Sequence, residues 1–152
     1  MGAGGARFRR DGGLRETAMD GLRDLYPEPS ALAVAKQIDR IDAHAAHFIA
    51  RSPFLVMATA DAQGLCDASP RGDAPGFVVV ADDRTLLLPD RPGNNRVDSL
   101  ANLAANPHVG LLFFVPGVIE TLRVNGRAEI TTEGALLATL AAEGRVPRSA
   151  LK

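Results

Sequence analysis

One loop of this sequence carries residues whose types and spacing suit anion binding. It spans Pro89–Arg96 and holds two prolines, one glycine, two asparagines and two arginines. A strand-like run, Thr85–Leu88, leads into the loop, and a helix-like run, Val97–Ala105, follows it. The start of a helix offers unpaired N–H groups and the positive end of the dipole, so it suits an anion. Asn94 or Asn95 can cap this helix.

Arg96 falls in the first turn of the expected helix, where the dipole favours acidic residues rather than cations. A bound phosphate would offset that arginine, so the loop indicates a phosphate-bearing ligand. The alternative is a capped strand-to-helix loop whose arginine is simply solvated. Two further ion pairs are open to the same plain interpretation: Arg91 with Asp90 within the loop, and Arg71 with Asp73 on an earlier turn.

Composition excludes several classes of function. The chain has 152 residues and a formal net charge of −1, which gives no field for nucleic acid or for an anionic membrane surface. Its single cysteine, Cys66, permits no internal disulfide and no cysteine cluster for a metal, and it predicts a cytoplasmic location. No run resembles a signal peptide or approaches membrane-spanning length. His44 and His47 could share a helix face, but no further ligand completes a metal site.

The sequence predicts a mobile N-terminal arm with a short helix over residues 1–29 and one domain over residues 30–152. Ser30 is typical of a helix N-cap, and apolar residues at helical spacing extend the expected helix to Ser52. The continuous apolar run Phe54–Thr59 predicts a central strand that is buried on both faces.

Further strands are expected where apolar runs lie between turn residues. Thr132 is expected to open a helix that ends at Gly144, and Pro147–Lys152 is expected to be irregular. This pattern predicts an α+β barrel. Side chains fill so small a barrel, so a ligand must lie outside it or between subunits, which favours a dimer. The six strands are expected over residues 54–59, 65–70, 77–80, 85–88, 109–115 and 119–131.

Several ordered motifs between residues 52 and 128 carry a family resemblance. They are Ser-Pro-Phe at 52–54, Ala-Ser-Pro-Arg-Gly-Asp at 68–73, Pro-Asp-Arg-Pro-Gly-Asn-Asn-Arg at 89–96, Asn-Pro at 106–107 and Glu-Thr-Leu-Arg-Val-Asn-Gly-Arg-Ala at 120–128. With them the sequence resembles the FMN-binding split-barrel family related to pyridoxamine 5′-phosphate oxidase, and within it a bacterial subgroup of flavoproteins. The resemblance implies a six-stranded antiparallel split β-barrel with flanking helices. It also implies a homodimer that binds FMN in a groove at the subunit interface.

The resemblance implies flavin contacts from one strand end, from the strand before the loop and from the loop itself. Where the family places a basic pair on the phosphate, this chain has Asn95 and Arg96, so Arg71 or Arg91 would supply the missing cation. Thr121 matches a position where the partner subunit reaches the flavin. No catalytic residue and no metal ligand is identified. The implied cofactor-binding residues are Ser69, Arg71, Leu88, Pro89, Asp90, Asn94, Asn95, Arg96 and Thr121.

The implied activity is that of an FMN-dependent oxidoreductase, in which a small-molecule donor passes a hydride to flavin N5. The family normally has a further strand and a C-terminal segment after the helix opened by Thr132, and this sequence ends at Lys152, where that strand would begin. Oxidation of vitamin B6 is therefore not carried over. The alternatives are a non-enzymatic module that binds or stores flavin, haem or the deazaflavin F420, and a purely structural dimer.

Overall fold

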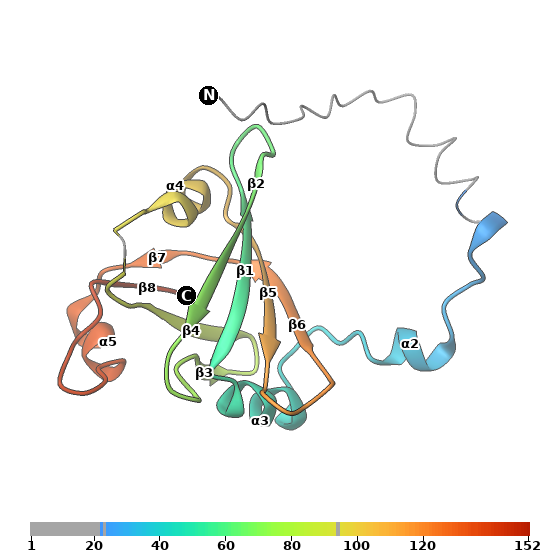
Figure 1. Ribbon diagram of the computed structural model, residues 1–152, viewed down its shortest axis with the longest axis horizontal. Helices are drawn as coiled ribbons and strands as arrows, with labels where there is room; N and C mark the ends of the chain where they lie inside the picture. The colour runs from blue at the N-terminus through green and yellow to red at the C-terminus, as the bar shows by residue number, and fades with distance from the viewer. Residues whose placement is uncertain (1–21, 23, 94) are drawn as a thin grey trace. The chain divides into compact units, whose positions relative to one another are not determined.

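The computed structural model describes residues 22, 24–93 and 95–152 (Figure 1). The chain divides after residue 38 into two compact units. The second unit, Asp39–Lys152, holds the strands and the candidate site. Most of the arm expected over residues 1–29 lies outside the described residues, and the domain boundary expected after it stays a prediction.

The helix expected from Ser30 to Ser52 is in fact two helices. α2, Ala31–Ala35, begins after Ser30, whose hydroxyl accepts a hydrogen bond of 3.2 Å from the amide three residues on. α3, Ala43–Arg51, begins after Asp42, whose carboxylate accepts a 2.8 Å bond in the same way. A capping aspartate has an extended backbone and bonds to the amides ahead of it, so it starts a new helix instead of continuing one.

Four antiparallel strands in the order β2-β1-β5-β6 form the first sheet. Along β1, Leu55, Met57 and Thr59 are buried, whereas Phe54, on the opposite face, is 39% exposed. β1 is central in this sheet as expected, but the expectation of burial on both faces is wrong for the single chain. The strands are β1 Phe54–Ala60, β2 Cys66–Gly72, β5 His108–Phe114 and β6 Leu122–Arg127.

The second sheet has the order β3-β4-β8-β7 and is also antiparallel. Its strand β8 corrects the expectation that Pro147–Lys152 is irregular. Ala150 and Leu151 are buried between β4 and β7, and the backbones of Glu129 and Lys152 exchange two hydrogen bonds of 2.8 Å. A strand of three residues is too short for its period to be recognised in a sequence. The strands are β3 Val79–Asp82, β4 Thr85–Asp90, β7 Ile130–Thr131 and β8 Ser149–Leu151.

The predicted α+β split barrel is confirmed, with a corrected strand count. The described residues form eight strands rather than six, because the sequence analysis missed β8 and took β6 and β7 as one strand. The two sheets run across one another in Figure 1, and the main core lies between them. Helix α3 contributes Ile49 to this core, and α4, Asp98–Ala105, contributes Leu103. The other buried residues of the core are Leu55, Met57, Phe77, Val78, Leu88, Leu111, Phe113 and Leu151.

The short helix α5, Gly134–Thr139, closes a second and smaller cluster. It begins after Glu133 rather than at Thr132, whose role as the expected N-cap is therefore wrong. Leu137 and Leu140 pack there against Leu87 of β4 and Ala150 of β8. This contact fixes the loop after α5 beside the end of β4, where the candidate site begins.

Candidate functional site

The loop after β4 does not use Asn95 as a helix cap. Asn95 has φ of 57°, a left-handed conformation that asparagine tolerates, and its side-chain oxygen accepts a 3.3 Å hydrogen bond from Arg148. α4 starts at Asp98, and its N-cap residue Val97 makes no side-chain cap bond. The capping expected of Asn95 is therefore wrong, and Asn94 lies outside the described residues.

Arg96 lies two residues before α4, not in its first turn. Its Nε and Nη2 donate to Oδ2 of Asp98 at 2.9 and 2.8 Å. The two side chains are 74% and 57% exposed, so the pair contributes under about 1 kcal/mol to stability. Asp98 suits the dipole at the helix start, and the weak pair holds Arg96 beside that positive end. An added anion could therefore replace Asp98 on Arg96 at little cost.

Arg71 joins the two sheets. From β2 it donates through Nη1 to Oδ1 of Asp90, the last residue of β4, at 2.8 Å. The side chains are 21% and 27% exposed, so this pair is screened much less than the Arg96 pair. The Nε of Arg71 is buried and has no hydrogen-bond partner among the described residues. Since such a donor costs about 1–3 kcal/mol when it is left unpaired, it marks a position that suits a ligand oxygen.

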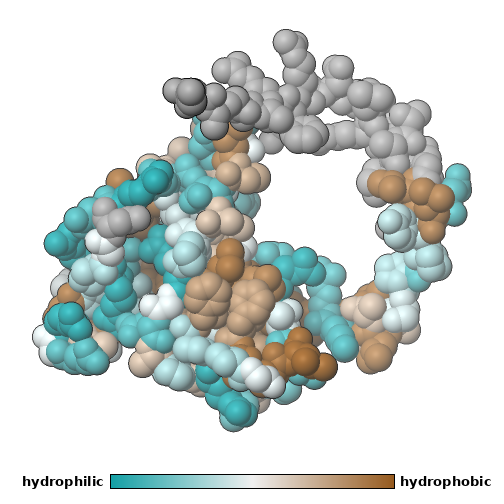
Figure 2. All heavy atoms as spheres, viewed as in Figure 1, coloured by the Kyte–Doolittle hydropathy of each residue, from teal (hydrophilic) through white to brown (hydrophobic). Residues whose placement is uncertain are grey.

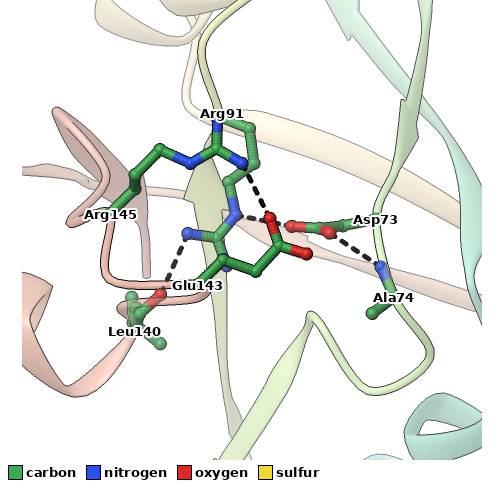
Figure 3. Close-up of polar contacts among 6 residues, drawn as sticks. All are labelled: Asp73, Ala74, Arg91, Leu140, Glu143 and Arg145. Carbon is green, nitrogen blue, oxygen red and sulfur yellow. Dashed lines mark hydrogen bonds and ion pairs between the residues drawn. The ribbon is translucent and has the colours of Figure 1, made fainter.

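Arg91 makes a second link between the sheets. Its Nε donates to Oδ2 of Asp73 at 2.7 Å, and its Nη1 donates to the Leu140 carbonyl at 3.0 Å (Figure 3). The pairs considered from the sequence, Arg71 with Asp73 and Arg91 with Asp90, are thus both wrong. Each arginine instead binds the aspartate of the other segment, so the exits of β2 and β4 are held together twice.

The carboxyl of Asp73 titrates below its usual range. The main cause of the lowered pKa is the hydrogen bond of 2.7 Å from the Ala74 amide, and Arg91 adds a hydrogen bond and its charge. The charge of Arg145 lowers the pKa further, while partial burial opposes these effects. Asp73 is therefore ionised at neutral pH and feels two guanidinium groups.

A hollow of about 220 Å³ opens beside this ion pair, with Asp73 and Arg91 on one wall and the loop after α5 on the other. In that loop Arg145 donates to Glu143 at 2.8 Å, and both side chains are more than 70% exposed. Figure 3 shows Arg91 and Arg145 converging from the two walls. The sequence analysis missed Glu143 and Arg145, because the loop carries no motif and only the fold brings it to β4.

The structure separates the other residues implied as flavin contacts. Ser69 is half-buried on β2, opposite Met57 of β1. Leu88 and Pro89 are buried in β4, where they pair with Leu151 and Ala150 of β8, and Thr121 is exposed just before β6. Among the described residues of the predicted set, Arg71 and Asp90 share a hydrogen bond. The role of every residue of the set in cofactor binding stays a prediction.

The described part of the chain contains neither a cluster of metal-ligating side chains nor a membrane-spanning helix. No group of three or more His, Cys, Asp or Glu side chains there could hold a metal ion. None of its helices is both long and apolar enough to cross a bilayer.

Two crossed antiparallel sheets with peripheral helices place the chain among the split-barrel α+β proteins. Residues 41–151 match the family model of pyridoxamine 5′-phosphate oxidase, so the chain belongs to that family. HupZ of Group A Streptococcus is 24% identical, with a TM-score of 0.58 over 73% of this chain and 86% of that one. A candidate pyridoxamine 5′-phosphate oxidase from Lactobacillus delbrueckii is 16% identical, with a TM-score of 0.57 over 76% and 88%. At these identities the likeness is one of fold, and no curated protein matches.

Proposed function

We propose that this chain binds FMN at an interface between two copies of itself and acts as an oxidoreductase through that cofactor. Membership of the pyridoxamine 5′-phosphate oxidase family supports the proposal. The single observation that carries it is the buried, unpaired Nε of Arg71, which lies where the exits of β2 and β4 meet.

The residues present fit a flavin phosphate or a flavin carbonyl oxygen. Arg71 offers a buried donor that needs an acceptor, and an ionised acceptor would make a charge-assisted bond of about 1.5–3 kcal/mol. Arg96 and the start of α4 offer a second positive region, where the exposed Asp98 would compete with an anion for Arg96. The bound flavin would supply the redox chemistry, while these residues would bind and orient it.

The outer face of the first sheet supports the proposed dimer. Residues that point outward from β1, β2 and β5 are nearly all apolar, and Figure 2 shows brown side chains over β1 and β5 and again at the connection between β5 and β6. In that connection Ile119 is 95% exposed. Contiguous apolar patches of this kind mark interaction surfaces, and a second copy would complete the burial expected of β1. The outward residues are Phe54, Val56, Ala58, Ala60, Cys66, Ala68, Pro70, Gly72, His108, Gly110, Leu112 and Phe114, of which His108 is the polar exception.

Titration of the purified chain with FMN and with riboflavin tests the proposal. FMN is expected to bind at micromolar levels and to raise the melting temperature, because a ligand of the folded state must stabilise it. Riboflavin should bind more weakly, since it lacks the phosphate. Arg71→Met should weaken FMN binding at least about tenfold. Arg84→Met, which removes an exposed arginine bonded to Asp39, is the matched control and should bind FMN normally. A colourless protein that takes up no FMN would reject the proposal.

A second experiment separates an oxidoreductase from a carrier. The FMN-loaded protein is mixed anaerobically with NADH or NADPH, and the visible flavin absorption is followed. Bleaching is expected if a hydride reaches the flavin, whereas a flavin that stays oxidised would favour storage or transport. Uptake of haem or of F420 in place of FMN would assign the same fold to a different cofactor and overturn the flavin proposal.

A further inference from the structure

The charged hollow beside Asp73 is too small for a flavin. Its volume of about 220 Å³ lies below the roughly 300–1,000 Å³ of sites that hold drug-sized ligands and cofactors. It holds about seven water volumes, which is room for a short organic acid. The nine residues that line it do not include Arg71, Asp90 or Arg96, on which flavin binding was proposed above.

Two arginines face this hollow, and they differ in how firmly hydrogen bonds and burial hold their side chains. Arg91 is fixed, since Asp73 and the Leu140 carbonyl occupy its Nε and Nη1 and its side chain is only 23% exposed. Arg145 is on the surface and pairs with Glu143, whose side chain is 81% exposed. An exposed pair of this kind is weak, so a ligand can replace Glu143 on Arg145 without disturbing the fold.

The charges around the hollow select the kind of anion. Arg91 and Arg145 are balanced by Asp73 and Glu143, so the four side chains sum to zero. A monocarboxylate that replaces Glu143 leaves Arg145 balanced and adds one charge only. A phosphate near −2 would add a second charge beside Asp73, which is held ionised. The Glu143 carboxylate itself already shows which chemistry Arg145 accepts there.

Apolar side chains complete the site. Pro92 follows Arg91 on one wall, and Val146 and Pro147 follow Arg145 on the other. They offer a surface for a short carbon chain but few polar partners for a second charged group. We propose that this hollow binds the carboxylate of a small monocarboxylic acid between Arg91 and Arg145, in competition with Glu143. The site lies outside the proposed flavin contacts, and its occupation does not depend on FMN.

Amide chemical shifts of residues 142–147 during a titration with butyrate test the inference. Saturable shifts are expected in the FMN-free protein, and the neutral analogue butyramide should produce none. Arg145→Gln should weaken butyrate binding at least about fivefold. Glu143→Gln should instead tighten it by about two- to fivefold, the range set by releasing an exposed ion pair. This opposite sign is what separates competition by Glu143 from a merely structural role of the loop.

Controls make each outcome decisive. Arg84→Gln removes another exposed arginine that is paired with an exposed carboxylate but lies outside the hollow, and it should leave butyrate binding unchanged. Phosphate should bind more weakly than butyrate; tighter phosphate binding would overturn the choice of a carboxylate. Absence of saturable shifts, or a Glu143→Gln variant that binds no tighter, would overturn the site. Because the titration uses protein without FMN, its failure and a failure of flavin binding remain distinguishable.

Discussion

Removing the Arg91–Asp73 pair should reveal a measurable coupling between the two sheets. Asp73 follows β2 of the first sheet, and Arg91 follows β4 of the second, so their bond of 2.7 Å crosses between sheets. The perturbation is a double-mutant cycle of Arg91→Met, Asp73→Asn and the double variant. Met keeps much of the arginine stem, and Asn keeps an oxygen for the Ala74 amide, so each change removes chiefly the ionic contact.

The expected coupling follows from burial and from the number of contacts. A hydrogen bond between ionised groups contributes about 1.5–3 kcal/mol, and the 23% and 30% exposure of these side chains reduces this to about 1–2 kcal/mol. Arg91→Met alone should cost more, about 2–3 kcal/mol, because it also takes a donor from the Leu140 carbonyl. That extra loss is the same whether or not Asp73 is present, so it cancels in the cycle.

Urea unfolding at a fixed protein concentration gives the four free energies, since the concentration affects the stability of any dimer. The Arg84–Asp39 pair is the matched control: its bond of 2.9 Å is nearly as short, but its side chains are 62% and 74% exposed. Because solvent screens this exposed pair, its coupling should be smaller than that of Arg91 and Asp73. If the effects of Arg91→Met and Asp73→Asn on the free energy of unfolding add within about 0.5 kcal/mol, the ends of β2 and β4 are not held together by this ion pair and the reasoning is refuted.

Three further predictions concern pH, a turn and the outer face. The folded pKa of Asp73 lies below its ordinary 3.8, so its contribution to the free energy of unfolding is fully present above about pH 4 and is lost as the pH falls through the folded value. In urea titrations at acid pH, the stability of the wild type should therefore approach that of Asp73→Asn. A difference in stability that stays constant with pH would contradict this. Gly76→Ala should lower the free energy of unfolding by about 1–3 kcal/mol in the same assay, because Gly76 has φ of +82° and a Cβ would lie 3.2 Å from the Ala50 carbonyl oxygen. An unchanged free energy would mean that the turn relaxes around the added methyl group. Val56→Glu should convert the proposed dimer to a folded monomer in size-exclusion chromatography, and an unchanged dimer would move the interface elsewhere.

Local chemistry was sufficient to predict the hairpin between β1 and β2. Asp61 accepts hydrogen bonds from the Gln63 and Leu65 amides at 2.8 Å, and Gly64 supplies a φ of 81°. These contacts span at most four residues, so the residue types in the sequence already specify the turn. The same holds for Ser30, which caps α2 through the third amide ahead of it.

Contacts between distant segments could not be predicted in the same way. Arg71 and Asp90 are 19 residues apart, and each had an oppositely charged neighbour in the sequence; only the crossing of the two sheets decides which pair forms. Likewise β8 is recognised by its pairing with β4 on one side and β7 on the other, since its three residues show no strand pattern in the sequence. Asp42 had a local signal, but the apolar spacing on either side concealed it.

The three arginines near the end of β4 differ in how much hydrogen-bonding capacity they have left. Arg91 has already used Nε and Nη1 inside the chain, and Arg96 holds an exposed carboxylate that water could replace. Arg71 alone of these three has a buried donor without an acceptor among the described residues. The folded chain already carries the cost of desolvating the Arg71 Nε, so a ligand acceptor that bonds to this donor recovers that cost in full. At Arg96, a ligand acceptor merely takes the place of solvent. Ligand affinity at this corner should therefore depend on Arg71 more than on the arginine that the loop motif first suggested.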